Sequence, residues 1–546
     1  MDINKNISFK DPVEFLTVDK VLSADEAIRN AVQVEIIPRE QSSFGFNDSN
    51  INVNNFTSAV SDRLRFYIND SSHYLDMRNS YINCEFQAIV LTAGNVNIPD
   101  RFIDEGGIHS SIRTVTVSIG GAVLGRIDDY AKWYNATKNF PMHSSEYRDR
   151  ILASSGDSSE DVSSPSVEVI NKPISFTQET ATLLVDGLLD LGVDGLASTE
   201  LQVGDKLVIF SNLRGEQEVE VLDIGGNRIV DVIGNGYALG AAEIDGIVLT
   251  KRTNQSTRKV VANGQVHNLS FNLPLGCLQL PEYFPLPLIQ PFGPLEIDIE
   301  FNRAEQVLVL ENLSDVAGDN KFAYTINRPR FIARMIRPGN VINAHKALFN
   351  SMGLMFPYVS WRHFENNIAQ GVGDTVLNIQ TNLKSARSIV SVATDQTRAN
   401  SSSQTAQNYK SQSTFLRDNL GEYRYLNGAM RMPEYDLVDM KDDRFASQAW
   451  QQYMLSVDMY NDYSSPSSSI KPYQWRGFTS ERFVASTPFK KHNSFFTGLD
   501  LSNNFLECEL NMRNGETRSV STAYHSWISF DSLLVISRAN GVRVYR

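Results

Sequence analysis

Residues 266–301 read VHNLSFNLPLGCLQLPEYFPLPLIQPFGPLEIDIEF and contain two stretches of apolar and polar alternation joined by a proline-rich crossing. In the second stretch one face collects the apolar side chains Leu295, Ile297, Ile299 and Phe301. This period of two is typical of a half-buried antiparallel strand. The six prolines of the crossing forbid a helix and remove ladder donors. The stretch therefore predicts two strands of one sandwich, joined by a Greek-key or jelly-roll corner.

The same pattern returns near the C-terminus in FLECELNM, residues 505–512, where Leu506, Cys508, Leu510 and Met512 alternate with polar residues. Each alternating strand is followed by a polar loop and a long apolar-rich strand, residues 323–336 in the first case and 523–537 in the second. We interpret this as a weak internal repeat of two β units. The alternative is that any two antiparallel strand pairs look alike at this level.

Length and composition favour several β domains. A chain of 546 residues exceeds the size at which a single hydrophobic core stops growing. Its 20 Tyr and 29 Phe occur largely in alternating runs with Val and Thr, which favour strands over helices. The sequence predicts an all-β protein.

Charge and cysteine usage exclude several classes of protein. A formal net charge of −13 disfavours a broad basic surface that neutralises phosphates, so we expect no direct sequence-specific binding of nucleic acid. The N-terminus lacks the pattern of a secretory signal, and no apolar run reaches the roughly 20 residues of a transmembrane segment. Cys84, Cys277 and Cys508 stand in apolar contexts and are predicted to be buried, unpaired thiols in a reducing compartment.

The chain divides into four expected parts. Residues 1–50 are polar and are predicted to be an N-terminal arm. A first sandwich should cover residues 51–338, and a second residues 339–546, with a boundary between Pro338 and Met352. Short strands between Gly-rich turns predict a compact β subdomain inserted in the first sandwich at about residues 171–262.

One segment of the first sandwich combines a strand, a Gly120-Gly121 turn and a short helix that starts near Asp128 and Asp129. Adjacent acids at a helix start are usually partners of the helix dipole or solvated charges, and we prefer these interpretations to acid-base catalysis.

The sequence contains none of the common motifs of a catalytic, phosphate-binding or metal-binding site. The eight histidines show neither HExxH spacing nor a cysteine pair at zinc-ligand spacing. There is no GxSxG or Walker sequence, and GNGYALG at residues 234–240 fits a β-turn better than a phosphate loop. We therefore expect no catalytic, cofactor-binding or metal-binding residues, and no enzyme activity.

Three stretches resemble double jelly-roll major capsid proteins, with the polinton-like virus and virophage branch as the nearest match. HSSIRTVTVSIGGAVLGRIDDYAKWYNATKNF at 109–140 resembles the strand, turn and helix of that family's first jelly roll. Residues 273–301 are similar to its Leu-Pro-Leu corner and the strand that follows. NLGEYRYLNGAMRMPEYDL at 419–437 is similar to a strand, Asn-Gly turn and proline of its second jelly roll. The insertion departs from the family pattern.

The resemblance implies two tandem eight-stranded jelly rolls with a short helix in each. It also implies a structural role in the virion, in which homotrimers form pseudo-hexagonal capsomers of an icosahedral shell around a DNA genome. Neighbouring capsomers, penton proteins and minor or cement proteins would be the partners. The alternative function is a β-rich glycan-binding lectin or adhesin, and a carbohydrate-active enzyme comes third.

Overall fold

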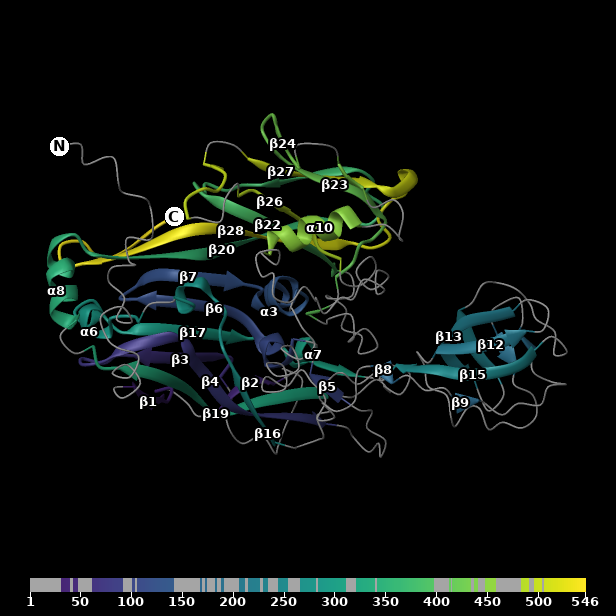
Figure 1. Cartoon of the computed structure of the whole chain (residues 1–546), viewed down its shortest axis with the longest axis horizontal. Coiled ribbons are helices and arrows are strands. Elements are labelled where there is room, and N and C mark those ends of the chain that lie inside the picture. The colour runs from purple at the N-terminus through teal and green to yellow at the C-terminus, as the bar shows by residue number, and fades with distance from the viewer. Residues whose placement is uncertain are drawn as a thin grey trace. The chain divides into compact units, whose positions relative to one another are not determined.

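The structure is a computed structural model of the whole chain (Figure 1). Outside the insertion it describes residues 31–39, 43–47, 61–91, 101–103, 106–141, 266–280, 283–310, 321–338, 341–396, 412–413, 415–433, 437–439, 447–457, 483–490, 495–502 and 505–546. In the insertion it describes the strands between 167 and 253. The chain forms two compact units, Ser158–Lys259 and the remainder.

The first half of the larger unit is a sandwich of two antiparallel sheets. One sheet has the order β1-β19-β4-β16, with β2 (Ser43–Asn47) also paired to β19, and the other has the order β3-β17-β6-β7. The eight main strands are β1 (Ala31–Ile36), β3 (Arg63–Ile68), β4 (Tyr74–Leu91), β6 (Ile112–Ile119), β7 (Ala122–Asp128), β16 (Val266–Phe271), β17 (Leu295–Phe301) and β19 (Lys321–Ile336).

The second half is a sandwich with the same plan. Its sheets have the orders β20-β28-β22-β26 and β21-β27-β23-β24. The strands are β20 (Leu354–Ile368), β21 (Thr375–Ile379), β22 (Ala386–Asp395), β23 (Leu420–Asn427), β24 (Met430–Met432), β26 (Ala485–Pro488), β27 (Leu506–Met512) and β28 (Thr522–Ser537). Two short strands extend the sheets, β25 (Val438–Asp439) and β29 (Gly541–Tyr545).

The strand order identifies both sandwiches as jelly rolls. When the eight main strands of each half are lettered B to I along the chain, the two sheets are B-I-D-G and C-H-E-F in both halves. Two Greek keys wound in this way define a jelly roll. The predicted fold class is therefore confirmed by the strand pairing itself.

Alternation explains why these segments are strands. In β17 the four apolar side chains are buried and the three acidic ones are partly exposed, and β27 has the same pattern. Both strands lie between two neighbours in their sheet, as expected for residues that fill the centre of a core. Cys84, Cys277 and Cys508 are free and buried, which confirms their prediction as small core residues.

Helices occur in the connections. They are α3 (Tyr130–Tyr134), which continues into the π-helical turn η3 (Asn135–Asn139), and α6 (Leu286–Ile289), α7 (Ala304–Val307), α8 (Val341–Ser351) and α10 (Ser447–Ser456). Both α3 and α10 follow strand F of their jelly roll, and α8 joins the two jelly rolls. Shorter elements are β5 (Arg101–Ile103) paired with β18 (Leu308–Leu310), and the 3-10 turns η2 (Gly107–Ser111), η5 (Gly276–Leu278) and η9 (Arg513–Gly515).

The Gly-Gly turn forms as predicted. Gly120 and Gly121 connect β6 to β7 with φ of +55° and +86°, a left-handed conformation that glycine adopts without the strain of a side chain. A side chain at Gly120 would also meet the carbonyl oxygen of Phe292. The Asn540-Gly541 turn likewise connects β28 to β29.

The inserted unit is a separate antiparallel sheet. Its order is β10-β11-β14-β13-β12-β15-β8, with β9 also paired to β15. The strands are β8 (Val167–Glu168), β9 (Lys172–Pro173), β10 (Thr182–Leu183), β11 (Leu188–Asp190), β12 (Lys206–Ser211), β13 (Gly215–Gly225), β14 (Ile229–Ile233) and β15 (Ile244–Thr253). Leu207, Ile209, Val219 and Ile247 are buried in it. It lies in the connection between strands F and G of the first jelly roll.

The expected arm differs from the structure at its C-terminal end. Residues 31–36 and 43–47 are strands that pair with β19, so this part belongs to the first jelly roll. Both segments pair with the long strand β19. The polar composition of residues 1–50 gave no indication of this pairing. Residues 1–30, and most of the polar loop from Thr394 to Thr414, lie outside the described residues.

Candidate functional site

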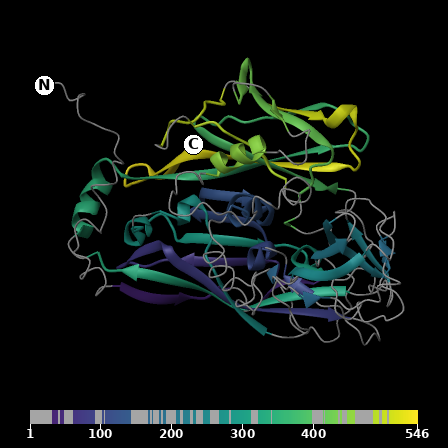
Figure 2. The ribbon, with the colours of Figure 1, turned by 45° about the vertical axis from the view of Figure 1, so that its right-hand side comes forward.

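The junction between the two jelly rolls is the candidate site, because it joins residues far apart in the sequence. In Figures 1 and 2, β7 and α3 of the first jelly roll lie against β20 and β28 of the second. The Tyr358 hydroxyl donates a hydrogen bond to the Leu124 carbonyl at 2.8 Å. Trp133 and Trp361 meet edge to face with ring centroids 5.7 Å apart. The junction is thus a packed core with its own hydrogen bonds.

The end of the first helix also contacts the second jelly roll. The Tyr453 hydroxyl of α10 donates to the carbonyl of Ala136. The rings of Phe140 and Phe415 meet edge to face at 5.5 Å. The first of these contacts joins the helical segments that follow strand F in each jelly roll, so these corresponding elements of the two halves meet at the junction.

Strand β28 is buried on both of its faces at the junction. Residues 522–532 are all buried, although alternate side chains of a strand point to opposite faces. Tyr524 and Ile528 point to the core of the second jelly roll, whereas the Trp527 indole donates to the Asp128 carbonyl of the first at 3.1 Å. Strand β28 is therefore covered by its own sandwich on one face and by the neighbouring jelly roll on the other.

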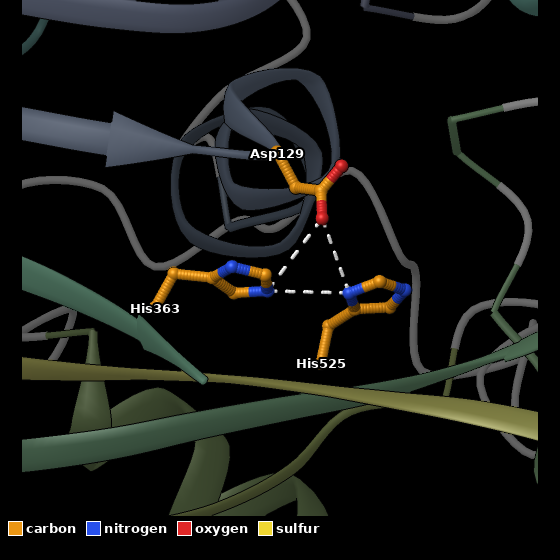
Figure 3. A group of neighbouring side chains, drawn as sticks. All are labelled: Asp129, His363 and His525. Carbon is orange, nitrogen blue, oxygen red and sulfur yellow. Dashed lines mark hydrogen bonds and ion pairs between the residues drawn. The ribbon is translucent and has the colours of Figure 1, made fainter. Parts of the chain in front are cut away.

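A cluster of three titratable side chains lies at this junction: Asp129, His363 and His525 (Figure 3). The His363 Nε2 atom is 3.2 Å from His525 Nδ1. The Asp129 Oδ2 atom is 3.3 Å from His525 Nδ1 and 3.6 Å from His363 Nε2. One carboxylate oxygen and two imidazole nitrogens thus converge on a single point.

The two strands of the second jelly roll position the histidines. His363 of β20 is directly opposite Trp527 of β28, and His525 precedes Trp527 by two residues on the same face. The three rings are stacked, with centroids of His363 and His525 5.4 Å apart and those of His363 and Trp527 5.1 Å apart. Sheet register and stacking therefore fix the orientation of both imidazoles.

Asp129 approaches from the first jelly roll. It precedes α3 with φ of 49°, a left-handed conformation that aspartate tolerates better than most residues. Its carboxylate makes no capping hydrogen bond to the helix. Figure 3 shows that it points across the junction to the two histidines. Asp129 precedes the helix as predicted, but its side chain contacts the second jelly roll and does not cap the helix.

Lys132 and Thr394 complete the surroundings of the cluster. The Lys132 Nζ atom is 3.5 Å from Asp129 Oδ1 and 3.1 Å from His525 Nε2. Thr394 Oγ1 of β22 is 3.3 Å from the same Nε2 atom. Both nitrogens of His525 thus have polar neighbours, Nδ1 on the side of Asp129 and Nε2 on the side of Lys132 and Thr394.

The protonation of the cluster follows from burial and charge. Burial together with the charge of Lys132 lowers the pKa of His525 to about 4. Burial also lowers the pKa of His363, although Asp129 opposes the shift. Burial alone would raise the pKa of Asp129, but the charge of Lys132 and the hydrogen bond from His525 hold it well below its usual range. At neutral pH the cluster has an ionised carboxylate and two neutral imidazoles.

Sequence reasoning missed this cluster. Its members are 234 and 162 residues apart along the chain (363 − 129 and 525 − 363), so no local spacing signals them. Strands β20 and β28 bring the histidines together, and the packing of the two jelly rolls adds the aspartate. The only local signal is His525, a polar residue in an apolar-rich strand of the kind expected to be buried on both faces.

Comparisons with known proteins give likenesses in structure only. No family model matches the sequence, and none of the curated proteins does. The chain is similar to a chain of the Sputnik virophage structure with 11% identity and a TM-score of 0.49, covering 93% of this chain and 89% of that one. For the Faustovirus major capsid protein the values are 8%, 0.47, 93% and 90%, and for the mavirus major capsid protein 7%, 0.40, 94% and 90%. At such identities the likeness concerns the fold alone.

Within the described ranges, each helix is too short or too polar to cross a membrane.

Proposed function

We propose that the chain is a major capsid protein, a subunit that assembles as homotrimeric pseudo-hexagonal capsomers into an icosahedral viral shell around a DNA genome. The sequence resemblance first suggested this role. The physical support comes from the way in which the two jelly rolls of one chain are joined.

The observation that carries the proposal is that the two jelly rolls point in the same direction. Along β7, Leu124 contacts Tyr358, and Asp129, just after β7, contacts His363 further along β20. The two adjacent strands therefore run parallel, strand F of the first jelly roll beside strand B of the second. Strands B, D, F and H of a jelly roll share one direction, so both sandwiches have the same end up.

This orientation suits a shell. Two similar upright sandwiches per chain give a trimer six similar walls, and a closed ring of heterologous contacts needs such repeated surfaces. A lattice of upright jelly rolls would separate an outer end from an inner end. The BC, DE, FG and HI connections of both jelly rolls leave from one end, and the CD, EF and GH connections from the other.

The positions of the long connections support the assignment of these ends. The insertion is an FG connection, so it is attached at the end that carries the BC, DE, FG and HI connections, which we infer to be the outer end. Ala31 lies opposite Ile336, just before α8, so the chain enters the first jelly roll from the other end. We infer that residues 1–30 act at the inner face as a tie between neighbouring capsomers. Penton and cement proteins would complete the shell.

The test is the assembly state of the purified full chain. Light scattering should give trimers, and negative-stain electron microscopy should show pseudo-hexagonal capsomers or shells. A chain in which a short linker replaces Ser158–Lys259 should still form trimers, because this unit is compact by itself. Monomers with sugar-dependent thermal shifts would contradict the capsid role and favour the lectin alternative.

A further inference from the structure

We propose that Asp129, His363 and His525 form a Zn²⁺ site that ties the first jelly roll to the second. Asp129 is contributed by the first jelly roll and both histidines by the second, so a bound ion would bridge the junction (Figure 3). The site is a property of the single chain and does not depend on the capsid role.

Distances between the donor atoms fit a tetrahedral ion. Zinc binds imidazole nitrogen at about 2.0–2.1 Å and carboxylate oxygen at about 2.0–2.2 Å, so neighbouring donors in a regular tetrahedron are about 3.3–3.5 Å apart. The three observed separations are 3.2, 3.3 and 3.6 Å. An ion could contact all three atoms with little movement, and water would fill the fourth position.

The donor set suits this ion. The two imidazole nitrogens favour zinc and similar transition metals over calcium or magnesium, which prefer oxygen, and a carboxylate oxygen also binds zinc. The three donor atoms are already held by strand register, ring stacking and the conformation of Asp129. A site whose ligands are fixed before binding loses little conformational entropy when the metal enters.

Protonation is also compatible with a metal. Both histidines must offer a lone pair at the ion, His363 at Nε2 and His525 at Nδ1. The proton of His525 then belongs on Nε2, where Thr394 Oγ1 at 3.3 Å can accept it. Such a hydrogen bond from the far nitrogen fixes the tautomer of a ligating histidine. The metal thus needs a shift of tautomer, and the net number of protons stays the same.

Lys132 opposes the metal and gives the proposal a sharp test. Its ammonium group can donate to His525 Nε2 only while that nitrogen carries no proton, and this is the tautomer that places the proton on the metal-binding Nδ1. Its charge also neutralises Asp129 in the absence of an ion. Metal binding therefore requires Lys132 to give up its contact with His525, and removal of Lys132 should strengthen binding.

The experiment uses the purified full chain after treatment with a chelator. Titration calorimetry with Zn²⁺ should give one ion per chain, and Co²⁺ should produce the visible absorption of a tetrahedral site. Saturating Zn²⁺ should raise Tm by about 2–5 °C, because the ion binds only the folded junction. His363→Gln and Asp129→Asn should lose the bound ion and the Tm shift. Lys132→Met should bind about tenfold more tightly.

His73→Gln is the matched control. His73 is paired with a carboxylate, Asp70, at 3.0 Å, but among the described residues only the Asp129 cluster brings three candidate ligands together. This variant should bind Zn²⁺ like the unmodified chain. Absence of binding by the unmodified chain, or equal binding by His363→Gln and Asp129→Asn, would overturn the proposal. Circular dichroism of each variant separates loss of the ion from loss of the fold.

Discussion

The two jelly rolls share a strand order but differ in their connections. Between strands F and G, the first carries a complete extra sheet and the second carries the helix α10. The eight main strands of the two jelly rolls nevertheless have the same pairing. The two H strands also have the same burial pattern. The comparison teaches that the sandwich is specified by alternation within strands, whereas the connections can grow without changing it.

The GH connections give the sharpest difference between the halves. A Cβ added to Gly276 would lie 2.0 Å from the carbonyl oxygen of Val359, which belongs to the second jelly roll. A Cβ added to Gly498 would lie 2.3 Å from the carbonyl oxygen of Ala386, within its own jelly roll. Gly276 therefore allows the backbones of the two jelly rolls to approach each other closely. Gly498 allows a close backbone approach within the second jelly roll.

The largest expected effect is that of Gly276→Ala. The new methyl group collides with backbone that cannot rotate away, so the junction must open, and we expect a loss of more than about 3 kcal/mol of stability. Limited proteolysis should then release two separate jelly-roll fragments. Gly498→Ala should instead destabilise the second half alone. Gly373→Ala is the control, because a Cβ there meets no atom within 4 Å, and an equal loss in the control would refute this explanation.

The second prediction compares corresponding core residues. Ile299 in β17 and Leu510 in β27 occupy the same position of the repeated strand, and both are fully buried. Ile299→Ala and Leu510→Ala should each cost about 2–5 kcal/mol, measured by chemical denaturation. Glu300→Ala, on the other face of β17, should cost far less. If the losses of stability of the two core variants differ by more than about 3 kcal/mol, the width of this range, the two strands do not make equivalent contributions to their cores.

Much of the fold could be predicted from the sequence. The alternation of Leu295 to Phe301 and of Leu506 to Met512 located both H strands, because burial of one face imposes a period of two. The turn at Gly120-Gly121 was also identified, because few residues other than glycine adopt its left-handed backbone conformation. The strands at 31–36 and 43–47 were missed, because their pairing depends on β19, nearly 300 residues away.

The candidate site could not be predicted in this way. A metal-binding motif is visible in a sequence when one helix or loop supplies several ligands at fixed spacing. Here the position between β7 and α3, strand β20 and strand β28 each contribute one ligand, and the packing of the two jelly rolls decides which residues meet. The conclusion from histidine spacing, that no metal site is supported, therefore applied only to local motifs.

A third prediction concerns pH and the first jelly roll. His109 is buried, with Nδ1 3.0 Å from the Tyr130 hydroxyl and its ring stacked on Tyr134 at 3.8 Å. Burial lowers its pKa to about 3. Below about pH 6.5 the His109 imidazole takes up a proton in the unfolded chain but not in the folded chain. The free energy of unfolding is therefore unaffected by this group above about pH 6.5 and falls as the pH drops towards 3. At pH 5 the loss should be about 2 kcal/mol.

His109→Phe isolates this contribution. The difference in denaturation midpoint between pH 7 and pH 5 should be smaller in the variant than in the unmodified chain. An unchanged pH dependence in His109→Phe would mean that other groups carry the acid sensitivity.

The smallest expected effect concerns ion pairs at corresponding positions of the H strands. Asp298 in β17 pairs with Arg63 of strand C, whereas Glu509 in β27 pairs with Arg424 of strand E. The side chain of Arg63 is 45% exposed and that of Arg424 only 17%. Solvent and salt screen an exposed pair more strongly, so Asp298→Asn should cost about 0.5 kcal/mol and Glu509→Gln about 1 kcal/mol.

Salt provides the check on this last comparison. Raising the NaCl concentration from low values to about 1 M shortens the screening length to roughly 3 Å. It should remove most of the difference between Asp298→Asn and the unmodified chain, but less of the difference for Glu509→Gln. Asp298 also lies 3.5 Å from Arg65, so it has two cationic partners. If the number of partners mattered more than their exposure, Asp298→Asn would be the more destabilising change, and the order of the two variants decides between these explanations.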